Sequence, residues 1–393
     1  MDVDALRAGT PGCRNRIHLN NAGAALMSQQ TLDAVVGHLR LEARIGGYEA
    51  AAAAADRVAA VYAGLAELLG GRADEIALFD NATHAWQAAF YSVPLRPGDR
   101  ILTGRNEYGS NVLAYLQAAR RAGAEVVVVP NDADGQLDTS ALAGLIDGRT
   151  KMIGLTHVPT AGGLVNPAAD VGRIARAAGV PYLLDATQSV GQFPVDVAEI
   201  GCDFLCGTGR KFLRGPRGTG FLWVRSGVLE RLEPHVVEIQ SAEWDGARGF
   251  DWVPGARRFA TWELNYAAVL GLGAAVDQAL NLGLDEIGKR NEELGDRMRG
   301  LLEDIPAVTV HDLGRQRCAI VTATVDGLES ELVVARLAES GVNVTSTEPA
   351  HQQFDTEERH PPPLVRFSPH YYNTEDEVEH AAALVGALAG KRL

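Results

Sequence analysis

The chain has 393 residues, 46% hydrophobic and 22% charged, which is enough to bury one large core or two and excludes a mainly disordered protein. Fifty acidic against 36 basic residues give a net charge of -14, which opposes a surface that follows nucleic-acid phosphates. The four cysteines form neither a paired framework nor a zinc-type spacing. We therefore expect a reducing, cytoplasmic setting, no metal and no nucleic-acid partner.

The amino terminus, Met1–Asp4, is acidic and is not followed by an apolar stretch long enough for a signal peptide or a membrane span. The alanine run at 50–55 lies between Glu49 and Asp56 and indicates a helix start. We expect no association with a membrane.

Short β-rich runs alternate with helical stretches between residues 75 and 225, a pattern typical of an α/β domain with a largely parallel sheet. The helical stretches carry apolar residues at three- and four-residue spacing. Seven strands are expected, at 76–79, 101–103, 125–129, 152–156, 182–185, 203–206 and 220–224.

Past residue 259 the pattern changes to long helices, at 262–282 and on to about 302, and then to a smaller α+β domain. The segment 349–363 is rich in proline and charge, so we expect an exposed, mobile cover. The predicted division is an amino-terminal segment 1–15, a large domain 16–260 and a small domain 261–393 that starts with the linking helix. Further strands are expected at 308–310, 319–325 and 364–367, and further helices at 328–340 and 374–389.

Four lysines are available for chemistry that needs a primary amine. Lys151, Lys289 and Lys391 have ordinary surface interpretations. Lys211 follows an apolar strand and a Gly-Thr-Gly turn and precedes a glycine-rich return. A desolvated lysine beside cations shifts toward its neutral, nucleophilic form, as a Schiff base requires. A solvated turn lysine is the alternative.

Asp185 ends the hydrophobic run 180–184. A carboxylate is costly to bury there unless it pairs with a proton-bearing cation, and a pyridinium nitrogen is such a partner. A strand-end aspartate that caps a turn is the alternative interpretation.

Together these segments resemble the cofactor signature of class V aminotransferases, which are fold-type I enzymes dependent on pyridoxal 5'-phosphate (PLP). The resemblance runs from about Asn20 to Asn373 and rests on the order and spacing of 184–191, 195–197, 202–204, 207–211 and 215–220. It implies a fold-type I PLP-dependent transferase, an α/β fold with a seven-stranded, mainly parallel sheet and a smaller carboxy-terminal α+β domain.

By matching position, the resemblance implies that Lys211 forms the Schiff base and later moves the α-proton of an amino-acid substrate. Asp185 would hold the ring nitrogen protonated, so that the ring becomes an electron sink. Gln188 would hydrogen-bond the ring hydroxyl, and Tyr108 would stack on the ring where many relatives have a histidine. Thr160 stands where relatives place an asparagine near that hydroxyl.

The resemblance also implies a phosphate site at the start of the helix that begins at Ala82 and Thr83, where backbone N–H groups are free. Thr208 and Arg210 would add a hydroxyl and a charge, although the family often has histidine in place of Arg210. Thr261 would come from the partner subunit of a homodimer with active sites at the interface.

Two further positions match substrate contacts in the family. Arg366 corresponds to the arginine that binds the substrate carboxylate as a fork, and an edge-strand arginine is the alternative. Asn21, in the 19–23 segment, corresponds to a loop that closes over the substrate.

Departures from the family pattern narrow the range of reactions expected of this chain. Desulfurases need a mobile cysteine in the small-domain loop, and the segment 344–363 has none. The patterns at 42–48 and 107–109, together with 207–220, resemble ergothioneine-type carbon-sulfur lyases, which cleave cysteine sulfoxide conjugates to pyruvate and ammonia. Transamination or epimerisation of an amino acid is the alternative, and a PLP-binding protein without turnover is a third reading.

Overall fold

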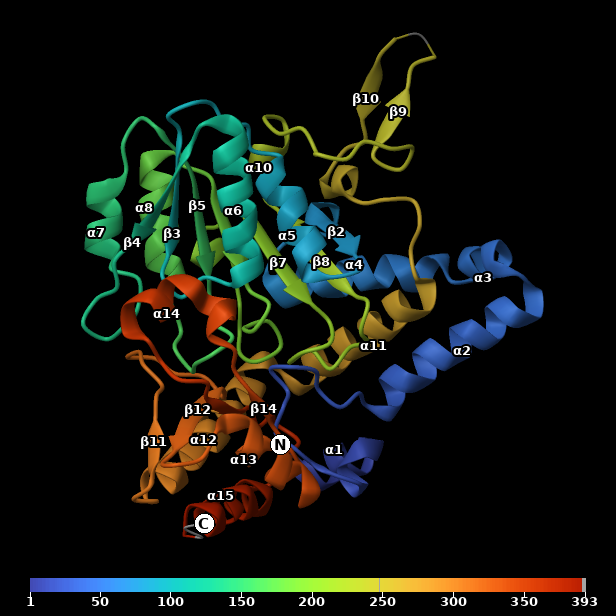
Figure 1. Cartoon of the computed structure of the whole chain (residues 1–393). Helices are drawn as coiled ribbons and strands as arrows, with labels where there is room; N and C mark the ends of the chain where they lie inside the picture. Colours follow the sequence, from blue (N-terminus) through green and yellow to red (C-terminus); the bar gives the residue numbers. More distant parts are fainter. Residues whose placement is uncertain (247, 391–393) are drawn as a thin grey trace.

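A seven-stranded sheet forms the centre of the large domain in this computed structural model, which describes residues 1–246 and 248–390 (Figure 1). The strands lie in the order β2-β8-β7-β6-β5-β3-β4. β8 is antiparallel to both neighbours, and the other pairs are parallel. The expected fold class is confirmed. The strands are β2 (Ile76–Phe79), β3 (Arg100–Gly104), β4 (Glu125–Val129), β5 (Thr150–Thr156), β6 (Tyr182–Asp185), β7 (Phe204–Thr208) and β8 (Gly220–Val224).

Helices cover both faces of this sheet, so its inner strands are buried on both sides and read as continuous apolar runs. One apolar core joins the sheet to α4, α7, α8, α9 and α11, and the other joins it to α5, α6 and α10. These helices are α4 (Ala55–Leu69), α5 (Ala82–Tyr91), α6 (Gly109–Ala122), α7 (Thr139–Leu145), α8 (Ala168–Ala178), α9 (Val197–Ile200), α10 (Ser226–Leu229) and α11 (Tyr266–Leu282).

The small domain is a second sheet, in the order β11-β12-β15-β14, packed with helices around a core of its own. β12 starts two residues later than predicted because the carbonyls of Cys318 and Ile320 accept hydrogen bonds from the buried Arg299. The elements are α12 (Leu284–Glu303), β11 (Val308–Val310), β12 (Val321–Val325), α13 (Ser330–Glu339), β13 (Val342–Asn343), β14 (Thr345–Ser346), β15 (Val365–Phe367) and α15 (Glu375–Gly390).

The amino-terminal residues lie against the small domain. β1 (Ile17–His18) pairs in parallel with β13, and Asn20 bridges to Ser368. Residues 17–20 therefore associate with the small domain, whereas the predicted large domain begins at residue 16; the rest of that division stays a prediction. Before and after β1 come α1 (Val3–Ala8), η1 (Pro11–Arg14), α2 (Gln29–Ile45) and α3 (Gly47–Ala53).

The linking helix starts later than expected. Asn265 caps α11 by accepting a hydrogen bond from the Ala268 N–H at 2.9 Å, so residues 262–265 form a loop instead of helix. No single helix in the described residues is long and apolar enough to cross a membrane; α11 and α12 pass that test only as a pair bent by 84°.

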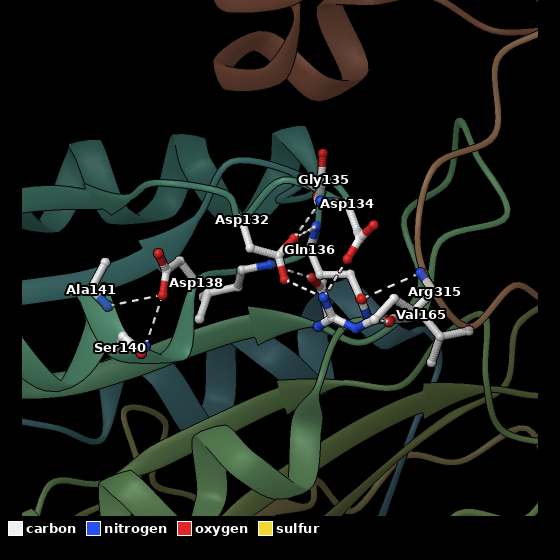
Figure 2. Close-up of polar contacts among 12 residues, drawn as sticks. Asp132, Asp134, Gly135, Gln136, Asp138, Ser140, Ala141, Val165 and Arg315 are labelled. Atoms are coloured by element: carbon white, nitrogen blue, oxygen red, sulfur yellow. Dashed lines mark hydrogen bonds and ion pairs between the residues drawn. The ribbon is translucent and has the colours of Figure 1, made fainter.

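The turn that follows β4 in the large domain binds a loop of the small domain (Figure 2). Asp132 and Asp134 both form ion pairs with Arg315, at 2.9 and 2.5 Å. Gln136 donates to the Val165 carbonyl at 2.6 Å, and its own oxygen accepts from the Arg315 N–H. These contacts fix the segment 157–166, which leads to the pocket described below, between the two domains.

The expected cover segment is helical over most of its length, as η4 (Pro349–Gln352) and α14 (Gln353–Arg359). Glu358 forms an ion pair with Arg105. A Cβ on Gly109 would lie 3.2 Å from the His351 carbonyl oxygen, so η4 rests directly on the start of α6. α14 thus lies between the two domains beside the carboxyl end of β3 (Figure 1).

Candidate active site

One pocket lies at the carboxyl ends of β5, β6 and β7, where ligands bind in doubly wound sheets. It is lined by Lys211 and by every expected cofactor contact except Thr261. Because parallel strands end at the same edge of the sheet, residues up to 130 positions apart in sequence, Asn81 and Lys211, converge here. The other expected contacts in the lining are Ala82, Thr83, Tyr108, Thr160, Asp185, Gln188, Thr208 and Arg210.

Lys211 enters the pocket from the turn that follows β7. A Cβ at Gly209 would lie 2.3 Å from Thr219 Oγ1, so the tight approach of this turn to the return strand requires glycine. The lysine side chain is buried, and its pKa lies well below the ordinary value, first because of burial and then because of the nearby charges of Arg210 and Arg366. The amine is therefore shifted toward its neutral, nucleophilic form.

Asp185 is the last residue of β6 and is 6% exposed. Its Oδ1 accepts a hydrogen bond from the Thr187 N–H at 3.0 Å, and its Oδ2 accepts one from Asn111 Nδ2 at 2.9 Å. Two donors hold a buried acceptor in a fixed direction beside the pocket, as expected for the partner of a protonated ring nitrogen.

Thr160 connects Gln188 to Arg366. Gln188 Nε2 donates to the Thr160 hydroxyl at 3.4 Å and to the Ala22 carbonyl at 3.2 Å, and its Oε1 is buried with no partner within the described residues. Arg366 Nη1 donates to the backbone oxygen and the hydroxyl of Thr160, at 2.8 and 2.9 Å. The free Gln188 oxygen can accept from a hydroxyl on a ring bound in the pocket.

The donors of Arg366 can be counted. A guanidinium has five N–H groups. Thr160 takes two of them, and Asn20 Oδ1 takes one from Nη2 at 3.3 Å. The Nε–H, which is buried without a partner in the part of the chain described, and one N–H of Nη2 are left. These two donors form one side of the fork, which suits a carboxylate bound through two parallel hydrogen bonds.

The phosphate donors expected from the sequence gather at the other end of the pocket. Asn81 caps α5 by accepting from the His84 N–H at 2.9 Å, which leaves the N–H groups of Ala82 and Thr83 as free donors of the first turn among the residues described. Thr208 and Arg210 line the same pocket. Their side chains also bond within the chain, to the Thr219 carbonyl at 2.8 Å and to the Gly23 carbonyl.

Two expected contacts lie elsewhere in the single chain. The Asn21 amide is fully buried, and its hydrogen bonds go to other residues of the chain. It donates to the Ser368 carbonyl at 2.7 Å and accepts from the Tyr372 hydroxyl at 2.5 Å. The adjacent Asn20, which sequence reasoning missed, contacts Arg366 instead. Thr261 is exposed and lines a separate cavity with Asp80 and His84, residues beside the start of α5.

Asn111 also escaped prediction, although it follows Tyr108 by one helical turn on α6. Tyr108 is the N-cap of α6 and lines the pocket, as expected of a residue that covers a ring face. A polar residue three positions after a pocket residue on a helix faces the same side, and that spacing was the available signal.

Comparison with known proteins agrees with this geometry. A family model described as aminotransferase class-V matches residues 17–380. The chain belongs to the class V aminotransferase family. It is 30% identical to a probable cysteine desulfurase of Xylella fastidiosa (strain Temecula1), over 96% of this chain and 93% of that protein.

Two solved structures share the fold of this class V protein. The cysteine desulfurase CsdA of Escherichia coli has a TM-score of 0.91 at 23% identity and covers 99% of this chain and 98% of its own. The cystine C-S lyase C-DES, in complex with cysteine persulfide, has a TM-score of 0.86 at 23% identity and covers 96% of this chain and 99% of its own.

The cofactor of this class V enzyme is PLP. The pocket fits it in four respects: a buried amine with a lowered pKa at Lys211, a fixed buried carboxylate at Asp185, an oxygen at Gln188 without a partner in the described residues, and free helix N–H groups at Ala82 and Thr83. When bound, PLP supplies an electron sink for charge that develops on the α-carbon of an amino acid.

Proposed function

We propose that this enzyme is a carbon-sulfur β-lyase that converts a cysteine S-conjugate, such as a cysteine sulfoxide, into pyruvate and ammonia. The observation that carries the proposal is the pocket with Lys211 and Asp185 in its lining and Arg366 bonded to its lining residue Thr160, combined with a cover segment, 344–363, that contains no cysteine. The same site residues serve every reaction of the family that begins at the α-carbon. The missing cysteine separates the lyase from a desulfurase, and the products separate it from transamination and epimerisation.

In this reaction Arg366 holds the substrate carboxylate through its free Nε–H and Nη2–H. The amine of Lys211, whose pKa is lowered by burial, takes the α-proton, and Asp185 would hold the ring nitrogen of bound PLP in its protonated form. The Cβ–S bond then breaks, and its electron pair leaves with sulfur. Addition of water and loss of ammonia balance the products: the S-conjugate and one water give pyruvate, ammonia and a thiol, or a sulfenic acid from a sulfoxide.

The cysteines are poorly placed to accept sulfur. Cys202, Cys206 and Cys318 are buried, and Cys13 is half-buried among the amino-terminal residues. Burial raises the pKa of the Cys318 thiol to about 12, and it also raises the pKa of the Cys206 thiol well above its ordinary value. A persulfide acceptor must present a thiolate at the substrate, and a raised pKa opposes that.

Cysteine desulfuration is the second candidate, because the curated relative reported above carries that name. A desulfurase transfers sulfur from free cysteine to an enzyme thiol and releases alanine. The two reactions therefore differ in both products, alanine plus a protein persulfide in one and pyruvate plus ammonia in the other.

The decisive experiment supplies a cysteine S-conjugate and its sulfoxide to the holoenzyme and measures pyruvate. We expect stoichiometric pyruvate and ammonia, the same rate in a variant with all four cysteines replaced by serine, and none in Lys211→Ala. Alanine with persulfide on one cysteine would favour the desulfurase instead. A keto acid formed only with a second amino acid would favour transamination, and racemised substrate would favour epimerisation.

We further propose that the enzyme is a cytoplasmic homodimer in which Thr261 contacts the phosphate in the partner's pocket. The hairpin of β9 (Ala242–Trp244) and β10 (Phe250–Trp252) projects from the chain (Figure 1) and exposes Trp244, 77% accessible, which suits a subunit contact. The cavity of Thr261 adjoins the outer side of the turn that begins α5. In a mixture of Lys211→Ala and Thr261→Arg chains, heterodimers should regain activity. A mixture that stays inactive after subunit exchange would contradict a shared site.

A further inference from the structure

A buried carboxylic acid that none of these roles uses lies behind the ring-binding end of the pocket. Glu107 is 1% exposed, and no ion pair reaches it from the described part of the chain. Its Oε2 accepts from Thr103 Oγ1 at 2.9 Å. Its Oε1 accepts from the Tyr108 N–H at 3.0 Å and from the Thr156 hydroxyl. Glu107 thus joins the ends of β3 and β5 to the start of α6.

The third donor to Oε1 connects Glu107 to the cofactor site. Asn111 Nδ2 donates to Glu107 Oε1 at 2.9 Å, and the same nitrogen donates to Asp185 Oδ2 at 2.9 Å. A side-chain amide has two hydrogens on its nitrogen, one for each carboxylate. One amide group therefore links Glu107 to the partner of the ring nitrogen.

The two carboxylates select the same orientation of this amide. If the Asn111 amide turned over, its oxygen would face Glu107 and Asp185, acceptor against acceptor, among side chains that are all buried. If Glu107 lost its acceptor, only Asp185 would hold the amide, and the donor to Asp185 Oδ2 would no longer be fixed from behind. Burial, reinforced by the Asp185 charge, raises the pKa of Glu107, and the donated hydrogen bonds oppose that rise.

We propose that Glu107 is a positioning residue for the cofactor. It holds the Asn111 amide in one orientation, which directs Asp185 at the ring nitrogen. Its bond to the Tyr108 N–H fixes the N-cap of α6, the position from which the Tyr108 side chain covers the ring. The inference rests on the assignment of Asp185 and Tyr108 to the PLP ring, and it requires no particular reaction.

The test measures the apparent Kd of PLP for the apoprotein and the pH titration of the visible absorption band of the cofactor. Glu107→Leu and Asn111→Ala should each weaken PLP binding about fivefold to a hundredfold and move the titration midpoint, because the first loosens and the second removes the donor to Asp185 Oδ2. The double variant should be no weaker than the weaker single variant, because both act through one amide. Glu107→Gln retains an acceptor and should stay within about threefold of wild type.

Thr103→Val is the matched control: it removes the donor to Oε2 and should leave the titration midpoint in place. Any of three results would overturn the proposal. These are losses of PLP affinity that multiply in the double variant, an unchanged Kd in Glu107→Leu, and a Kd in Glu107→Gln as weak as that in Glu107→Leu. If Glu107→Leu does not fold, Glu107→Asp, which withdraws the carboxylate by one methylene, takes its place with the same expectations. Neither readout needs turnover, so a failed lyase assay leaves this test intact.

Discussion

Removal of the Arg366 side chain gives the sharpest prediction, because its two free N–H donors form the hydrogen bonds that the substrate carboxylate would lose. Arg366→Leu deletes two hydrogen bonds from a charged group to the substrate carboxylate. Bonds of this kind contribute about 1.5–3 kcal/mol each, so the pair contributes about 3–6 kcal/mol. That corresponds to a loss of about 10²- to 10⁴-fold in kcat/KM. Arg366→Lys keeps the charge without the fork and should recover only part of it.

The assay compares two substrates in each variant: a cysteine S-conjugate and the matching amine that lacks the carboxylate. Burial lowers the pKa of Arg366 only to about 10, so the guanidinium stays charged at neutral pH. Wild type should strongly prefer the amino acid. Arg366→Leu should lose that preference, because kcat/KM falls much further for the amino acid than for the amine.

The same comparison tests the alternative that Arg366 only supports the pocket wall. Its bonds to Thr160 and Asn20 are lost in Arg366→Leu as well, so some structural damage is expected for both substrates. Thr160→Val removes one of those bonds and keeps the fork, and it should preserve the preference for the amino acid. An equal fall for both substrates in Arg366→Leu would refute the carboxylate assignment.

Three further predictions follow from charge and burial. In Arg210→Gln the pKa of Lys211 should rise, because one of the cations that lower it is gone. The neutral amine that reacts with PLP then forms only at higher pH. The midpoint of the pH–rate profile for PLP attachment to the apoprotein should therefore move upward. An unchanged midpoint would place Arg210 too far away to act. Arg299→Leu should lower the free energy of unfolding by about 3–5 kcal/mol in urea titrations, since it leaves the buried Asp312 unpaired. Arg315→Ala breaks two ion pairs at the surface, with Asp132 and Asp134, and should cost at most about 1–2 kcal/mol, so similar losses in the two variants would contradict the burial argument. Finally, borohydride treatment of the yellow holoenzyme should attach the cofactor to the peptide that contains Lys211, and label on a peptide with Lys151 or Lys289 instead would disprove the central assignment.

The sequence was informative where chemistry is local. The strand at 182–185 could be predicted because a strand buried on both faces must be apolar throughout, and the polar residue that ends it then stands out. Lys211 stood out because it lies in a glycine-rich turn after an apolar strand, a short stretch of sequence, whereas the resemblance to the family was needed to single out Arg366.

The sequence did not predict the contacts that depend on the direction in which a single side chain points. Asn20 and Asn21 are adjacent and chemically identical, and only the bridge of Asn20 to Ser368 decides that Asn20 faces Arg366 while Asn21 is buried against Tyr372. The start of β12 was likewise set by Arg299, a residue of a different element, which takes the carbonyls that a strand would have used.

By itself the sequence determined the sheet, the order of its strands along the chain and the types of residue that follow them, because apolar periodicity and turn residues act over a few positions. Only the tertiary structure decided which donors remain free. Glu107 and Asn111 show why: their role depends on one amide nitrogen lying 2.9 Å from two carboxylates, and one of these, Asp185, is 74 residues further along the chain. Hydrogen bonds between distant segments are settled by packing, and no local pattern encodes them.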